Sequence, residues 1–176
     1  TYGVDIGAFT PFFYAFRERE MIIDLFESLA GGRLLFNYFR IGGVSKDLPD
    51  NFVADTNKFL DYFEKKLTEY DDLLSYNVIF LDRTKNIGMM SVEDAINYGV
   101  SGPNLRASGL KYDVRKNDTY SVYNKFEFDI PVGENGDCWD RYYIRMKEMR
   151  ESVKIIRQAI ISIPEGEIMT KVPRVI

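Results

Sequence analysis

Apolar positions recur at helical spacing through much of the chain, and the clearest stripe runs from residue 52 to residue 74. Steps of three and four residues separate most of its members, and charged residues fill the positions between them. The stripe consists of Phe52, Thr56, Phe59, Leu60, Phe63, Leu67, Tyr70 and Leu74. We expect this helix to start near Asp47-Leu48-Pro49, where an acidic cap stands beside a proline suited to a first turn.

A second long helix is predicted from about Asp137 to just before Pro164. Its apolar positions alternate steps of three and four, which is typical of a seam that packs against another helix. The seam consists of Trp139, Tyr142, Met146, Met149, Val153, Ile156, Ile160 and Ile163.

Residues 1–30 are predicted to be helical in two parts. Asp5, Phe9, Phe12 and Phe16 follow a spacing of i, i+4, i+7 and i+11, which places them on one helix face. Pro11 lies inside this run, and it should kink the helix or begin a new one. Gly31-Gly32 then ends the helical segment.

Shorter elements connect these helices. Residues 33–44 read as an extended piece, and 78–87 as a shorter helix or an extended connector. Ser91 resembles a helix cap, so 92–98 should be a short helix. We expect a loop over 101–109, a polar surface turn over 112–116, and extended chain over 110–133. The fold class is therefore mainly α, a long-helix core with loop-rich, extended connectors, and residues 1–176 form a single domain.

Composition excludes several classes of site. The chain contains no histidine and one cysteine, Cys138, so a Ser-His-Asp triad, an HExxH zinc site and an intrachain disulfide are impossible. A net charge of −4 argues against nucleic acid as the main partner. The 13 Phe and 12 Tyr can fill a core, an interface or an apolar ligand cavity. Because the first residue is Thr1 and not Met, we interpret the chain as a piece of a longer polypeptide.

Few residues are candidates for a chemical role. Asp5 shares the predicted face with phenylalanines, which would desolvate it and favour its protonated form; alternatively, it touches water near a helix end. Arg33, Arg40 and Arg106 can neutralise an anionic cofactor or form ordinary ion pairs. No glycine cluster matches a nucleotide-binding motif, and Cys138 lacks a neighbouring base or thiol in the sequence.

Several motifs, in order along the whole chain, resemble one family. They are Val4-Asp5-Ile6-Gly7-Ala8-Phe9-Thr10-Pro11-Phe12-Phe13, Asn37-Tyr38-Phe39-Arg40-Ile41-Gly42-Gly43-Val44, Ser101-Gly102-Pro103 with Leu105-Arg106-Ala107-Ser108-Gly109, and Gly136-Asp137-Cys138 with Asp140-Arg141-Tyr142. This pattern resembles the D subunit of respiratory complex I, the quinone-site subunit of NADH:quinone oxidoreductase. The chain is similar to the middle of that subunit, with the parts that precede and follow it missing.

The resemblance implies a fold, a reaction and partners. The fold would be the helical core related to the large subunit of nickel–iron hydrogenases. Electrons would arrive from the terminal [4Fe–4S] cluster of the neighbouring B subunit and reduce a quinone in a shared cavity, driving proton pumping. The chain itself would bind no cofactor. Its partners would be subunits B, C, H and I, on the cytoplasmic side of a bacterial membrane.

The resemblance also assigns residues. Asp5 matches the cavity aspartate, a candidate proton relay, and Phe12 and Phe16 match cavity phenylalanines. Arg40 matches an arginine near the cluster, with Arg33 close by. Many members carry histidine where this chain has Leu35, and often also where it has Ser45. A cluster of lower, pH-insensitive potential, suited to menaquinone, is therefore expected.

Two other interpretations stay open. The chain could belong to the equivalent subunit of a membrane-bound hydrogenase or of another quinone-linked dehydrogenase. Alternatively, as an isolated piece it could serve only as an inactive structural core and docking surface. The family's quinone-headgroup tyrosine and histidine fall in the missing part, so no enzymatic activity is expected of the piece alone.

Overall fold

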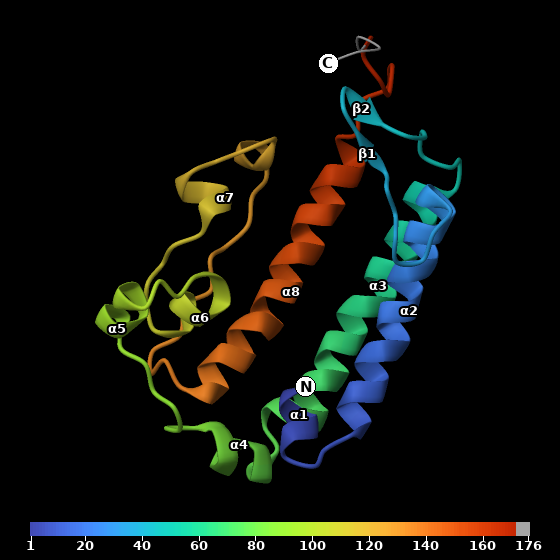
Figure 1. The fold of residues 1–176 in the computed structure, drawn as a ribbon. Coiled ribbons are helices and arrows are strands. Elements are labelled where there is room, and N and C mark those ends of the chain that lie inside the picture. Colours follow the sequence, from blue (N-terminus) through green and yellow to red (C-terminus); the bar gives the residue numbers. More distant parts are fainter. Residues whose placement is uncertain (172–176) are drawn as a thin grey trace.

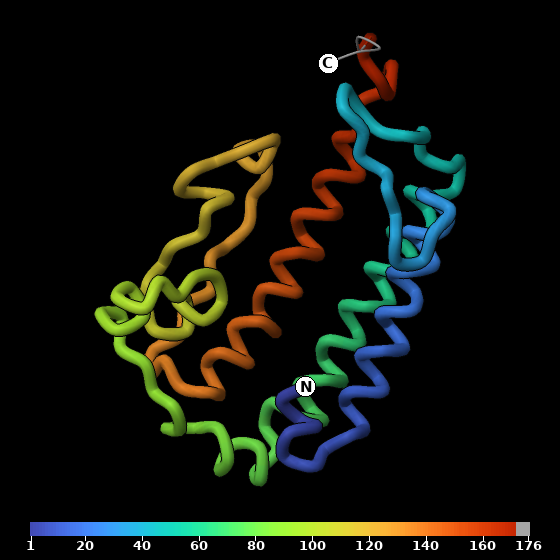
Figure 2. The backbone as a smooth tube through the Cα atoms, viewed as in Figure 1, coloured from blue at the N-terminus to red at the C-terminus, as the bar shows by residue number. Residues whose placement is uncertain are grey.

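Three long helices dominate the computed structural model, which describes residues 1–171. They are α2 (Thr10–Ala30), α3 (Phe52–Tyr70) and α8 (Cys138–Ile161), and α3 contacts both of the others. Figure 1 shows the three lying side by side, and the colours of Figure 2 show the chain reversing direction from α2 to α3 and again to α8. The predicted mainly α class is confirmed.

The buried side chains form two clusters along the α3–α8 contact. One contains Leu67, Tyr70, Leu74, Phe80, Tyr142 and Met146, and the other contains Phe59, Leu60, Val153 and Ile160. Most of these residues belong to the two stripes predicted from the sequence. Hydrophobic periodicity therefore located the main helix–helix contact correctly.

The predicted start of α3 was wrong. The helix begins at Phe52, preceded by Asn51 as the N-cap, and not at a residue near Asp47. The carboxylate of Asp47 instead accepts a hydrogen bond from the backbone N–H of Leu48, 2.8 Å away. A local turn therefore uses the acidic group that we expected to cap the helix.

After α3 the chain forms one π-helical turn, η1 (Asp71–Ser75), and then α4 (Val78–Thr84). The side chain of Asn77 caps α4 by accepting from the N–H groups of Ile79 and Phe80. The helical alternative for 78–87 is therefore confirmed over residues 78–84. The predicted short helix also forms, as α5 (Val92–Asn97), with Ser91 accepting from the N–H of Asp94.

The connector before α8 packs on the side of α8 away from α3 (Figure 1). It contains α5, α6 (Gly102–Ala107), α7 (Val114–Asn117) and the 3₁₀ turn η2 (Tyr123–Lys125). The loop expected over 101–109 was wrong, because Pro103 fits the first turn of a helix and Leu105 and Ala107 are buried. The polar surface turn expected at 112–116 was also wrong, since Asp113 is buried and caps α7.

The extended piece at 33–44 contains a short hairpin, which lies near the C-terminal end of α8 (Figure 1). Strands β1 (Phe39–Arg40) and β2 (Gly43–Val44) pair antiparallel, with Phe39 opposite Val44. Met169, which follows α8, bridges to Gly43. A Cβ on Gly43 would lie 2.1 Å from the carbonyl oxygen of Ile168, so only glycine permits this approach.

Candidate functional site

An apolar cavity of about 390 Å³ lies where α1 (Tyr2–Asp5), α2, α3, η1 and α8 meet. Phe12 and Phe16 come from α2, and their ring centroids lie 4.4 Å apart. The opposite wall includes Leu74 from η1 and Met146 from α8. A cavity of this size and character suits an apolar small molecule, because ligand sites are mostly hydrophobic clefts of a few hundred cubic ångströms.

The single helix face predicted for Asp5, Phe12 and Phe16 was wrong. Helix α1 ends at Asp5, Gly7 adopts a left-handed φ of +93°, and α2 begins only at Thr10. Asp5 is exposed and does not line the cavity, whereas Phe12 and Phe16 both do. The structure therefore brings together the two predicted phenylalanines but leaves the predicted acid beside the cavity.

The acid that does reach the cavity wall is Glu18, which was not among the predicted site residues. Its side chain is almost fully buried at 1% exposure. One carboxylate oxygen accepts from Tyr62 (2.9 Å) and from Arg17 (2.7 Å), and the other accepts a short hydrogen bond from Tyr70. Burial raises the pKa of Glu18, but the hydrogen bonds from Tyr70, Arg17 and Tyr62 outweigh it and leave the pKa below its ordinary value.

The sequence contains a signal for the buried position of Glu18. Pro11, Ala15, Ile22 and Leu25 stand at steps of three and four along α2, and Glu18 falls between Ala15 and Ile22 in the same series. A charged residue at a core position of an amphipathic stripe is the signal that would have found it. Burial also raises the pKa of its partner Tyr70, so that phenol keeps its proton.

The three residues expected near an iron–sulfur cluster lie around the hairpin. Arg33 bonds to Glu20, Asp24 and Glu27, at 2.5, 2.6 and 2.8 Å, and these hydrogen bonds raise its pKa. Arg40 instead bonds to the neutral amide of Asn37, and no ion pair to it occurs within residues 1–171.

Leu35 is 91% exposed, and Phe39 is 84% exposed. Both belong to the segment 33–44, and exposed apolar side chains that gather in one segment are typical of a surface that contacts another protein. Arg33 therefore fastens the segment 33–44 to α2, whereas Arg40 and Leu35 are exposed.

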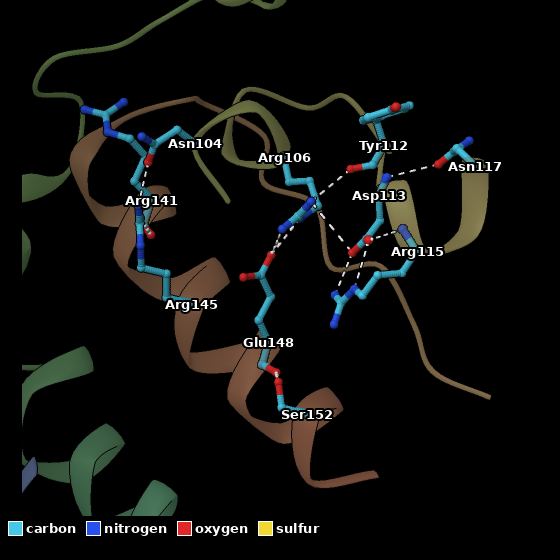
Figure 3. Close-up of polar contacts among 10 residues, drawn as sticks. All are labelled: Asn104, Arg106, Tyr112, Asp113, Arg115, Asn117, Arg141, Arg145, Glu148 and Ser152. Carbon is cyan, nitrogen blue, oxygen red and sulfur yellow. Dashed lines mark hydrogen bonds and ion pairs between the residues drawn. The ribbon is translucent and has the colours of Figure 1, made fainter. Parts of the chain in front are cut away.

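A buried ion cluster joins the connector to α8 (Figure 3). Arg106 of α6 bonds to Glu148 of α8 at 2.6 Å and to the carbonyl oxygen of Tyr112 at 2.9 Å. Asp113 lies 3.7 Å from Arg106 and 2.6 Å from Arg115. The hydrogen bond from Arg115 holds the pKa of the Asp113 carboxyl below its usual range, against its desolvation. Of the two roles open to Arg106, the geometry matches ion pairing.

Within residues 1–171, no three Cys, Asp or Glu side chains converge as metal ligands. Cys138 is partly buried, and its sulfur accepts from Arg141 at 3.1 Å. In the same part of the chain, no helix combines the length and apolarity needed to cross a bilayer.

The structure thus combines a helical core, an apolar cavity and an exposed hydrophobic hairpin. Residues 5–176 match the family described as the respiratory-chain NADH dehydrogenase 49 kDa subunit. The chain belongs to this family, as the sequence motifs predicted.

Similar proteins include the D subunit of the NADH-quinone oxidoreductase of Bacillus cytotoxicus, 55% identical over 174 residues. Those of Bacillus cereus (strain ATCC 10987) and Bacillus anthracis are 53% and 52% identical over the same length. Each alignment covers 98% of this chain and 48% of the relative. The chain therefore spans about half the length of these relatives.

Proposed function

We propose that the chain is part of the quinone-reduction module of a proton-pumping NADH:quinone oxidoreductase. In this role it would supply one wall of the quinone cavity, next to the terminal [4Fe–4S] cluster of the B subunit. The proposal draws on family membership and on the names of the relatives, which are NADH-quinone oxidoreductase subunits. The whole complex would carry out the oxidoreductase reaction, and the chain alone would be inactive.

The observation that carries this proposal is the apolar cavity that includes Phe12 and Phe16. A quinone presents a flat ring and a hydrocarbon tail, and the adjacent rings of Phe12 and Phe16 offer the apolar contacts that both need. The quinone would be menaquinone, which takes up two electrons and two protons when it is reduced to the quinol.

Asp5 would exchange a proton, or change its charge, when the quinone is reduced. It belongs to α1, whose residues Tyr2, Gly3 and Val4 line the cavity, so it stands at the rim and not in the wall. In the assembled complex we expect Asp5→Asn to lower quinone reduction and proton pumping. Undiminished activity in both assays would remove Asp5 from the mechanism.

The hairpin would contact the B subunit near its cluster, with Arg40 supplying positive charge and Leu35 apolar surface. The further neighbours would be subunits C, H and I, in the arm that faces the cytoplasm. Because Leu35 cannot titrate, the cluster potential should not vary with pH, and Leu35→His should introduce a pH dependence. A redox titration that shows a strong pH slope in the unaltered complex would contradict this assignment.

The cavity itself is tested by Phe12→Ala and Phe16→Ala in the assembled complex. Each variant removes an aromatic ring from the wall, so we expect quinone affinity to fall about tenfold, equivalent to about 1.4 kcal/mol. Phe26→Ala is the matched control, because Phe26 lies on the same helix but packs against Phe36, outside the cavity. Equal affinity in all three variants and the unaltered complex would show that quinone binds elsewhere.

A further inference from the structure

A series of hydrogen-bonded polar side chains leads from the cavity to the surface, beginning at Tyr142 of α8. Tyr142 lines the cavity, and its hydroxyl oxygen lies 2.9 Å from the Ser75 Oγ. Ser75 donates its one hydrogen to the Asp71 carboxylate at 2.6 Å, so Tyr142 must be the donor in the first contact. Beyond Asp71, the guanidinium of Arg150 completes the series with a short ion pair.

The first two members of this series are buried, and the last two reach the surface. Ser75 is fully buried and Tyr142 is 8% exposed, whereas the side chains of Asp71 and Arg150 are 14% and 37% exposed. The series therefore connects a cavity inside the helical core with the surface of the protein, and each link is within hydrogen-bond distance.

The π-helical turn η1 makes the series possible, because it supplies both Asp71 and Ser75. Such turns are rare and often occur at functional sites. The indole N–H of Trp139 bonds to the carbonyl oxygen of Ser75 at 3.1 Å, which fixes the turn against α8. The position of the serine hydroxyl is thus set from two sides.

We propose that Tyr142, Ser75 and Asp71 form a proton relay between the surface and a quinone reduced in the cavity. The relay rests on the proposed function, since it needs a proton acceptor in the cavity. It adds a second proton-handling route to the one proposed for Asp5, and it places that route in α8 and η1.

The proton count balances in one pass. Asp71 first takes a proton from solvent, and the two hydroxyls turn toward the cavity. The O–H bond of Asp71 then breaks as one forms on Ser75, the original Ser75 hydrogen moves to Tyr142, and the Tyr142 hydrogen moves to a quinone oxygen. The electrons come from the donor of the proposed reaction. Afterwards Tyr142 donates to Ser75 and Ser75 donates to ionised Asp71, which is the arrangement observed.

The surroundings keep the phenol in the protonated form that a relay needs. Burial raises the pKa of Tyr142 to about 12, although the hydrogen bond with Ser75 lowers it somewhat. The ionisable groups nearby are Arg150 on Asp71, the hydrogen-bonded Tyr76 and Tyr143 pair, and Tyr2, whose ring lies 6.0 Å from that of Tyr142.

Glu18 and Tyr70 also line the cavity, and they are hydrogen-bonded to each other. Both oxygens of Glu18 already accept hydrogen bonds, and the lowered pKa keeps this group ionised at neutral pH. Among the groups named around the series, Asp71 is thus the carboxylate placed to take a proton from solvent and pass it inward.

The test uses the assembled complex with a short-chain menaquinone analogue. Tyr142→Phe keeps the ring in the cavity wall and removes the relay hydroxyl, and Ser75→Ala removes the middle link. We expect both to lower kcat by about tenfold or more with KM unchanged, and to alter the pH profile and the solvent deuterium isotope effect. Ser75→Thr retains a hydroxyl and should restore the rate.

Two further variants separate a relay from a structural role. Tyr143→Phe removes a phenol hydroxyl one residue away, outside the series, and should leave kcat and its pH profile unchanged. Asp71→Asn can still accept from Ser75 but cannot carry a proton, so it should behave like Tyr142→Phe. An unaltered rate and isotope effect in Tyr142→Phe, or a loss in Ser75→Ala that Ser75→Thr does not restore, would overturn the relay.

Failure of the relay is distinguishable from failure of the proposed function. If Phe12→Ala and Phe16→Ala weaken quinone binding while Tyr142→Phe keeps the normal rate and pH profile, only the relay is wrong. If the two phenylalanine variants leave binding unchanged, the cavity is not the quinone site and both proposals fall. Gel densitometry of each purified complex measures its subunit content and so identifies loss of assembly. If a variant fails to assemble, the conservative Ser75→Thr and Asp71→Asn variants are compared with the unaltered complex instead.

Discussion

Replacing Arg106 by methionine should destabilise the chain strongly, because this guanidinium clamps the connector to α8. Its side chain is only 8% exposed. It donates to Glu148 and to the carbonyl oxygen of Tyr112, and it faces Asp113 at 3.7 Å. Methionine matches the length of the aliphatic stem but donates no hydrogen bond, so the change isolates the polar contacts from the packing.

The magnitude follows from what is left behind. Asp113 keeps Arg115 as a partner, but the Glu148 carboxylate, 17% exposed, loses its main counter-charge, and the oxygen of Tyr112 loses a donor. Removing one partner of a buried ion pair costs about 3–5 kcal/mol of unfolding free energy. The partial exposure of Glu148 places our expectation near about 3 kcal/mol, the lower end of that range.

Urea denaturation followed by far-ultraviolet circular dichroism measures this cost. Arg83→Met is the control, since Arg83 is exposed on α4, and it should change the free energy by less than about 0.5 kcal/mol. The double variant Arg106→Met/Glu148→Leu should be more stable than Arg106→Met alone, because it removes the stranded carboxylate. A cost below about 1 kcal/mol for Arg106→Met, or a double variant whose loss equals the sum of the single losses, would refute the reasoning.

Other perturbations give equally direct outcomes. Gly136→Ala should cost more stability in thermal unfolding than Gly99→Ala: both have positive φ, but a Cβ on Gly136 would lie 2.2 Å from a backbone oxygen, whereas Gly99 faces open space. Above the ordinary glutamate pKa of 4.5, Glu18→Gln should have a lower free energy of unfolding than the unaltered chain, and this difference should shrink as pH falls through the lowered folded-state pKa of Glu18. A difference that does not vary with pH in urea titrations would contradict this. Leu60→Ala should cost about 2–5 kcal/mol of unfolding free energy, whereas Leu35→Ala, at an exposed position, should cost almost nothing yet weaken co-purification of the B subunit.

The long helices were predictable because burial imposes a period on the sequence. The stripe from 52 to 74 contains Phe59, Leu60 and Leu67, and all three are buried against neighbouring helices. Short elements carry no such signal. Helix α6 spans six residues, too few for a period to emerge. Its Gly and Pro are typical of a loop, although Pro103 stands in the first turn, where a helix tolerates proline.

Side-chain chemistry was less predictable than helix position. Spacing placed Asp5 with Phe12 and Phe16, but Gly7 breaks the helix between them, so a face drawn across that residue has no physical meaning. Conversely, Glu18 was not predicted as a site residue, although it is buried. Hydrogen bonds from its neighbour Arg17 and from Tyr62 and Tyr70 of α3 compensate its burial. The two tyrosines become neighbours of Glu18 only through the tertiary fold.

The last helix shows why a single seam was an incomplete description of α8. Tyr142, Met146, Val153 and Ile160 face α3, as the predicted seam required. A second buried row, of which Ile144 and Ile155 are members, stands on another side of the helix.

Glu148 stands at helical spacing between Ile144 and Ile155 and binds Arg106 of the connector. Helix α8 therefore supports the cavity on one side and the connector on the other. Because the two sides share no side chain, loss of the Arg106 clamp should lower stability while leaving the quinone affinity of an assembled complex unchanged. A combined loss of stability and affinity in Arg106→Met would mean that the two faces of α8 are coupled.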